Sequence, residues 1–456
     1  MKRKFYLITV VFTFLVNNNM LIAQDYWQKT YPYGAWFNSG VDVQETSDGG
    51  FIFLGNALWP GTSQTRIARL LKITPTGDIQ WEKDFELSIV DWVSSVRETS
   101  DGGFAISGSL NGGVCIIKTN INGDTLFTRI FQCCGSTGPV FIRLFPNGDY
   151  LLGGEKQSPG NNIPFLIRAN QSGDMLWSKD ILNTVTSNAS ITDIEIINDN
   201  EFIYSYNDVI PHLTGADGNG ETLWTNTYYN SENGKLRGFT VSGDGKFATV
   251  GYTSDSTEIN PFIAEVNIAG DFLWSQLPTP MHCQATSIEI IPDGYIVGMT
   301  SAFPQDSAKA YFYKIGMTGE EIWKTSFPAR AGGPFIVYPT TDGGFIGAGT
   351  LNSEMMLIKT DALGEITSSH NPDVFPAWEI FPNPASDLIE LKFGRGLSEM
   401  TRLEWLSLDG QLLGRTSLEQ GTTNYQLSTA AFSSGVYLLK LIQGNAVAVN
   451  RVVVQQ

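Results

Sequence analysis

The chain has 456 residues, of which 42% are hydrophobic and only 16% are charged, and its formal net charge is −17. This charge argues against a nucleic-acid partner, because phosphate binding needs a basic face. The 27 Phe, 16 Tyr and 11 Trp residues exclude a disordered chain, and the 47 glycines lack the strict period of collagen, so the composition favours many short strands joined by tight turns.

The first 24 residues have the pattern of an export signal. Lys2, Arg3 and Lys4 precede an apolar run over residues 5–16, and a small residue, Ala23, follows near a plausible cleavage point. The run would form a helix of about 18 Å, too short for a bilayer core of about 30 Å. We therefore expect a signal peptide over residues 1–24 and no transmembrane segment in the rest of the chain.

Two turn motifs alternate through residues 25–370. One motif places Gly-Asp or Gly-Glu shortly before an aromatic residue, and its glycines lie 45 to 50 residues apart; they are Gly77, Gly123, Gly173, Gly220, Gly270, Gly319 and Gly364. The other is an Asp-Gly-Gly-Phe-like turn; its copies begin at Asp48, Asp101, Asn147, Asp199, Asp244, Asp293 and Asp342. Seven copies of each motif at so steady a period indicate a repeat architecture.

Each repeat is predicted to contain four strands. In the first repeat they are residues 41–45, 51–55, 67–73 and 78–85, and Asp48-Gly49-Gly50 is the first hairpin turn. Seven such units predict a seven-bladed β-propeller over residues 25–370. A stack of flat solenoid coils is the alternative, and it fits the aromatic positions less well.

The ring is predicted to close through the N-terminal segment. Residues 26–31 resemble a fourth strand that has no repeat of its own, whereas the last repeat has no aromatic fourth strand. We therefore expect Trp27 to lie in a strand that completes the last blade and removes both free edges.

The repeats resemble those of secreted bacterial β-propellers that carry a "DGGF" hairpin and a "KxxxxGxxxW" hairpin. Lys72 to Trp81 and Lys359 to Gly364 carry this resemblance, which covers about residues 25–370. It implies the fold and leaves the ligand open.

After a predicted linker over residues 371–378, the motifs change. Pro382, Asn383 and Pro384 precede a strand, Asp409 and Gly410 form a hairpin turn, and Gly435 and Tyr437 begin a late strand. Residues 379–456 resemble the C-terminal sorting domain of type IX secretion cargo from Bacteroidota. The resemblance implies a small β-sandwich, the type IX secretion machinery as a partner, and a secreted or outer cell-surface location. A sandwich that binds ligands and has no export role is the alternative.

The sequence contains no recognisable catalytic, metal or cofactor set. His212, His282 and His370 lie outside metal-ligand spacings and nucleophile motifs, so we predict no catalytic residue, no metal and no cofactor. The adjacent Cys133 and Cys134 resemble the cysteine pair of quinone-dependent alcohol dehydrogenases, which differ in having eight blades and a calcium and carboxylate set. A quinoprotein (PQQ-type) dehydrogenase is therefore the alternative function. With Cys115 and Cys283, three disulfide pairings are possible.

The strand order of a blade places the tight turns on one face of the ring and the longer, variable loops on the other. Trp36, Trp59 and Trp92 fall in the long connections around the first blade. Exposed aromatic rings stack on sugars or anchor protein partners, so we expect these three to bind a glycan or a protein. The alternative is that they cover the propeller core. The predicted function is thus that of an exported interaction protein.

Overall fold

The computed structural model describes most of the chain after the predicted signal peptide. The described residues are 26–34, 37–58, 66–87, 91–134, 138–158, 160–182, 188–228, 234–243, 245–254, 259–278, 282–301, 308–330, 335–366, 378–407, 412–443 and 446–455. No helix in this described part is long and apolar enough to cross a membrane.

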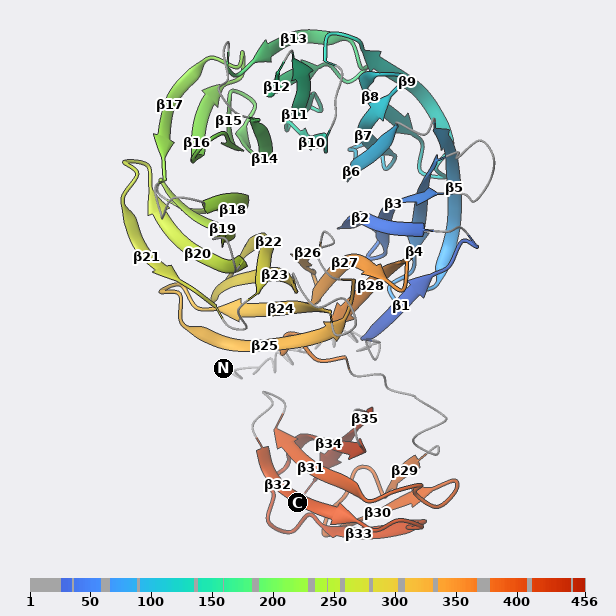
Figure 1. The fold of residues 1–456 in the computed structure, drawn as a ribbon. Helices are drawn as coiled ribbons and strands as arrows, with labels where there is room; N and C mark the ends of the chain where they lie inside the picture. The colour runs from blue at the N-terminus through green and yellow to red at the C-terminus, as the bar shows by residue number, and fades with distance from the viewer. Residues whose placement is uncertain are drawn as a thin grey trace, which may run out of the picture.

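Seven antiparallel four-stranded sheets surround a central axis, as the repeats predict (Figure 1). The innermost strands are β2 (Phe37–Glu45), β6 (Trp92–Glu98), β10 (Phe141–Leu144), β14 (Ser190–Asn198), β18 (Gly234–Gly243), β22 (Cys283–Ile291) and β26 (Ile336–Pro339). The second strands are β3 (Phe51–Leu58), β7 (Phe104–Leu110), β11 (Tyr150–Ser158), β15 (Glu201–Asn207), β19 (Lys246–Ser254), β23 (Gly294–Ser301) and β27 (Phe345–Leu351). The third strands are β4 (Arg66–Ile73), β8 (Gly113–Thr119), β12 (Asn161–Ala169), β16 (Pro211–Asp217), β20 (Ile259–Asn267), β24 (Lys309–Ile315) and β28 (Glu354–Thr360). The outer strands are β5 (Ile79–Leu87), β9 (Thr125–Phe131), β13 (Met175–Asp180), β17 (Thr222–Thr227), β21 (Phe272–Gln276), β25 (Glu321–Pro328) and β1 (Trp27–Tyr31).

The N-terminal strand β1 closes the ring. It pairs antiparallel with β28, from Trp27 opposite Lys359 to Tyr31 opposite Met355, and so supplies the fourth strand of the last blade. The prediction made from its resemblance to an orphan fourth strand is confirmed. The first and last parts of the ring are therefore held together by hydrogen bonds within a single sheet.

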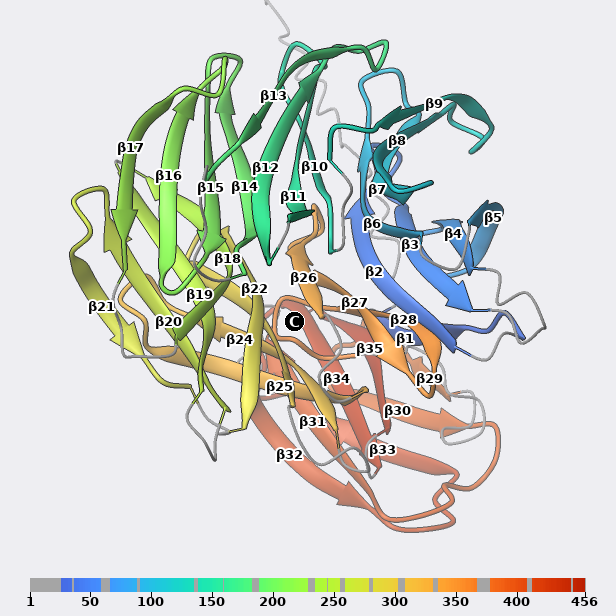
Figure 2. The same ribbon diagram turned by 45° about the horizontal axis from the view of Figure 1, so that its top comes forward.

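The strands of the first blade extend beyond their predicted limits. Pairing of β2 with β3 runs from Phe37 opposite Leu58 to Glu45 opposite Phe51. Residues 56–58, which lie beyond the predicted limit of the second strand at residue 55, therefore belong to β3. The second and third strands are buried on both sides, because each sheet packs between two others (Figure 2).

The aspartate of the Asp-Gly-Gly turn forms hydrogen bonds and an ion pair within its own blade. In the first blade, Asp48 accepts hydrogen bonds from the Gly50 amide and from Lys72 Nζ at 2.8 Å, and Lys72 projects from the third strand. Equivalent ion pairs join Asp101 to Lys118, Asp293 to Lys314 and Asp342 to Lys359, and in the third blade Asp149, the third residue of its turn, pairs with Arg168. In each of these pairs, an aspartate of the turn neutralises a lysine or arginine on the third strand of the same blade.

The Gly-Asp motif and its aromatic residue form contacts between neighbouring blades. Trp27 packs on Gly77 of the next blade and donates from Nε1 to the Pro75 carbonyl at 3.1 Å. Gly77 has a φ of +82°, and a Cβ there would lie 2.6 Å from the Trp27 ring, so no other residue fits the turn. Lys29 of the same strand pairs with Asp78 at 2.8 Å. The aromatic residue and the Gly-Asp turn are thus two halves of one contact between blades.

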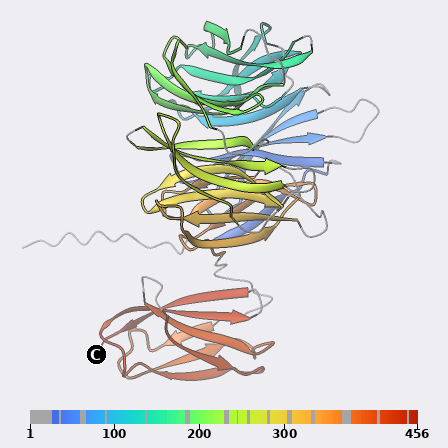
Figure 3. The same cartoon turned by 60° about the vertical axis from the view of Figure 1, so that its left-hand side comes forward.

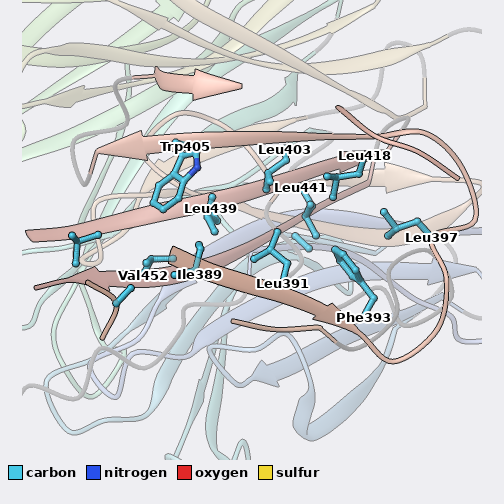
Figure 4. Close-up of a cluster of buried hydrophobic side chains, with 13 residues drawn as sticks. Ile389, Leu391, Phe393, Leu397, Leu403, Trp405, Leu418, Leu439, Leu441 and Val452 are labelled. Atoms are coloured by element: carbon cyan, nitrogen blue, oxygen red, sulfur yellow. The ribbon is translucent and has the colours of Figure 1, made fainter. Parts of the chain in front are cut away.

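The C-terminal domain is a two-sheet sandwich, shown beside the ring in Figure 3. One sheet contains β29 (Trp378–Phe381), β30 (Leu388–Phe393) and β33 (Asn424–Ser428). The other contains β32 (Leu412–Leu418), β31 (Thr401–Ser407), β34 (Gly435–Gln443) and β35 (Ala446–Val454). Figure 4 shows the core between them, in which Leu391, Trp405 and Leu439 are buried.

Candidate functional site

The axis of the propeller contains two adjoining cavities. The narrower, of about 80 Å³, is lined by residues from the innermost strands of all seven blades, among them Asp42, Ser94 and Tyr338. The wider, of about 280 Å³, is lined by Gln44, Arg97, Glu98, Arg143, Leu144, Glu195 and Ile196. Arg97 and Arg143 line both cavities. We call the two together the central channel.

The wide part of the channel lies towards the face of the tight turns. Its lining residues Glu98 and Leu144 are the last residues of β6 and β10, and tight hairpin turns follow both strands. The sequence had led us to expect a binding surface on the variable-loop face. The wide part of the channel lies on the opposite face.

Two ion pairs at the wall of the channel each join two neighbouring blades. Arg97 Nη1 lies 2.6 Å from Asp42 Oδ2, and Arg143 Nη2 lies 2.7 Å from Asp193 Oδ1. Arg97 also donates to the Tyr338 hydroxyl at 3.2 Å. Burial alone would lower the pKa of Arg97, but the charge of Asp42 raises it, so the guanidinium stays charged. These contacts hold both guanidinium groups against the channel wall.

Two further carboxyls in the channel have raised pKa values. Burial raises the pKa of Glu195 to about 7, and the charge of Asp193 adds to this effect. Burial raises the pKa of Glu289 to about 8, with further contributions from Glu195 and Asp193. Arg143 opposes both shifts but is already paired with Asp193. Near neutral pH the channel therefore contains carboxyls that hold or release a proton readily.

The channel also contains polar atoms with unused hydrogen-bonding capacity. Asp42 is only 3% exposed, and within the described residues its Oδ1 has no hydrogen-bond partner, although Oδ2 accepts from Ser95, Val96 and Arg97. Ser94 Oγ likewise has no partner in this part of the chain. Buried polar atoms are normally paired, so these two are available to water or to a ligand. Among the described residues, no group of three or more His, Cys, Asp or Glu side chains is placed to hold a metal ion.

The structure locates only one of the three predicted binding tryptophans. Trp36 and Trp59 lie outside the described residues. Trp92 is the first residue of β6 rather than a loop residue, is half-buried, and lies beneath the Arg66 guanidinium, which is 4.9 Å from its ring centroid. Whether these rings bind a ligand stays a prediction.

The charged residues of the channel were missed by the sequence analysis. A signal was present, because the first strand of several repeats carries charges within an apolar segment: Asp42, Arg97, Arg143, Asp193, Glu195 and Glu289. The first strand of every blade borders the axis of a propeller, so charged residues within these strands could have been identified as candidates for the channel.

The structure explains most of the sorting-domain motif. Asn383, between Pro382 and Pro384, donates from Nδ2 to the Arg451 carbonyl and accepts at Oδ1 from the Val453 amide, both at 2.8 Å. It therefore fixes the last strand of the chain. Gly435 begins β34, and the Tyr437 ring packs against Trp405 and Phe432. Asp409 and Gly410 lie outside the described residues.

Comparison with known proteins assigns the C-terminal domain. Residues 379–455 match the family described as the secretion system C-terminal sorting domain. The chain therefore carries a type IX sorting domain and is destined for secretion or the outer cell surface, as the sequence predicted. No curated protein matches the chain.

Several solved structures resemble the chain in outline. A chain from the structure of Drosophila Plexin A in complex with Semaphorin 1b has 7% identity and a TM-score of 0.49 over 74% of this chain and 87% of that one. Drosophila Semaphorin 2a has 7% identity and a TM-score of 0.45 over 95% and 96% of the two chains. A protein of unknown function from Bacteroides caccae has 12% identity and a TM-score of 0.37 over 73% and 92%. The count of seven blades rests on the strand pairing itself.

Proposed function

We propose that this exported propeller is a glycan-binding protein that holds the end of a sugar chain in the wide part of the central channel. The observation that carries the proposal is the cavity of about 280 Å³ that places Arg97, Arg143 and Glu195 around one space. A cavity of this size lies just below the range of about 300–1,000 Å³ that is usual for ligand sites.

The chemistry of the lining suits a hydroxyl-rich ligand. Each sugar hydroxyl both donates and accepts, so it can donate to the Glu195 carboxyl while a neighbouring hydroxyl accepts from a guanidinium. Leu144 and Ile196 offer apolar surface to the C–H face of the ring. Because both arginines are held by Asp42 and Asp193, little side-chain entropy is lost on binding.

The variable-loop face is a second candidate surface for the same function. Trp92 is stacked beneath Arg66 at the start of the second blade, and an aromatic ring of this kind suits a sugar or a protein anchor. The quinoprotein alternative predicted from the cysteine pair is tested by adding pyrroloquinoline quinone and assaying dye-linked alcohol oxidation.

A glycan array with the exported protein, followed by calorimetry on the best ligand, tests the proposal. Glu195→Gln keeps the size of the side chain but removes its charge, and we expect it to weaken binding about tenfold. Glu201→Gln on β15 of the same blade is the matched control, since Glu201 lines neither cavity. If Glu195→Gln bound the glycan as wild type does and Trp92→Ala did not bind it, the binding site would lie on the variable-loop face and not in the channel. If the protein bound no glycan on the array, the glycan proposal would be wrong.

A further inference from the structure

Cys133 and Cys134 bring two thiols together immediately after the outer strand β9. Their Sγ atoms lie 2.9 Å apart. Cys133 is exposed, whereas Cys134 is 2% exposed and packs with Phe131 and Val140. One thiol of the pair is therefore accessible from solvent and the other lies directly behind it.

The other two cysteines are held away from this pair. Cys115 on β8 belongs to the apolar cluster between the first and second blades, whereas Cys134 belongs to the cluster between the second and third blades. The sheet of the second blade thus separates them. Cys283 is buried at the start of β22 in the sixth blade. Of the three pairings that four cysteines allow, the fold leaves only a bond between Cys133 and Cys134, with Cys115 and Cys283 as free thiols.

We propose that Cys133 and Cys134 form a disulfide between adjacent residues during export. The sorting domain routes the chain through the periplasm, where thiols are oxidised. The oxidant is a disulfide-bearing thiol oxidase of the envelope. The exposed Cys133 thiolate attacks its disulfide to give a mixed disulfide, and the Cys134 thiolate then displaces the enzyme. The two cysteines lose two electrons and two protons in total, and the oxidase is reduced to a dithiol.

The surroundings of the two thiols favour this order of attack. Burial raises the pKa of Cys134, and the Cys133 thiol adds to the shift, so Cys134 is the poorer first nucleophile. The product closes a small ring through the peptide bond between the two residues. This ring stiffens the backbone at Cys133 and Cys134, just after the end of β9.

Thiol counting on the exported protein tests the proposal. The protein is alkylated with N-ethylmaleimide in denaturant, with and without prior reduction, and its intact mass is measured. We expect two modified cysteines without reduction and four with it. Cys133→Ser should give three under both conditions, and the matched control Cys115→Ser should give one and three.

Two outcomes would contradict the proposed disulfide. Four modified cysteines without reduction would show that no bond forms. A dimer on a non-reducing gel that disappears in Cys133→Ser would show that the exposed thiol pairs between chains. Either result would overturn the proposal, and both are readable without a known ligand.

Discussion

At the scale of single residues, the channel pairs some of its charges and leaves others without a matching partner. Asp42 and Asp193 each face an arginine, whereas Glu195 and Glu289 share the same low-dielectric space without one of their own. Keeping a carboxyl charged in such a place costs free energy, so the folded state favours its neutral form. Asp193, Glu195, Arg97 and Arg143 all act on Glu289.

This arrangement predicts a stability that falls as the pH rises. The pKa of Glu289 is about 8 in the folded protein against an ordinary value of 4.5, so its contribution is fully present below pH 4.5 and is lost as the pH rises through 8. We expect Glu289→Gln to flatten the pH dependence and to stabilise the protein above pH 8 by at least about 1 kcal/mol. Urea unfolding between pH 5 and pH 9 measures this. Equal slopes for wild type and variant would contradict it.

The predicted aromatic platform is tested by Trp36→Ala, Trp59→Ala and Trp92→Ala. If these rings anchor a ligand, each change should cost on the order of 2 kcal/mol of binding free energy with little loss of stability. If they cover the core instead, each should cost about 3–5 kcal/mol of unfolding free energy. Thermal unfolding and calorimetry on the same variants separate the two results. For Trp92, Arg66→Ala is the control that removes the stacked cation and keeps the ring.

At the scale of elements, ring closure depends on one short strand. β1 supplies five residues to the last blade, and Trp27 inserts between that blade and the first. The ring therefore uses hydrogen bonds and an aromatic contact to join segments that are far apart in the sequence.

Removing this contact should open the ring. Trp27 is 6% exposed, so Trp27→Ala should lower the free energy of unfolding by about 3–5 kcal/mol. Thr30→Ala in the half-buried part of β1 is the control and should cost about 1 kcal/mol. Denaturant unfolding measures both. Similar losses for both variants would show that Trp27 has no special part in closure.

At the scale of the whole molecule, a charge-poor propeller is joined to a small domain that directs export. The ion pair between Lys440 on β34 and Glu365 beyond the last blade, at 2.6 Å, links the two parts. The apolar core of each part lies within its own sheets. The propeller and the C-terminal domain thus have separate hydrophobic cores.

Deleting residues 375–456 should trap the protein in the periplasm of its host. The deletion removes the matched sorting domain and leaves all seven blades. Immunoblots of periplasm, cell surface and medium measure the distribution, and Asn383→Ala provides a milder variant that frees the last strand. Normal surface levels of the truncated protein would refute an export role for this domain.

The repeat number, the closing strand and the export route could all be predicted from the sequence. The repeat number and the closing strand depend on local signals, namely glycines that must adopt a positive φ and aromatic residues at a fixed offset from them. The export route depends on the C-terminal motifs, which match a known sorting-domain family. Which charged side chains meet could not be predicted, because that depends on the tertiary structure. Asp42, Arg97, Asp193 and Glu289 come from four blades, and only ring closure turns their strands towards one axis and removes the water around them. The same reason applies to the cysteines, because the sheet of the second blade leaves Cys133 and Cys134 as the one pair in reach.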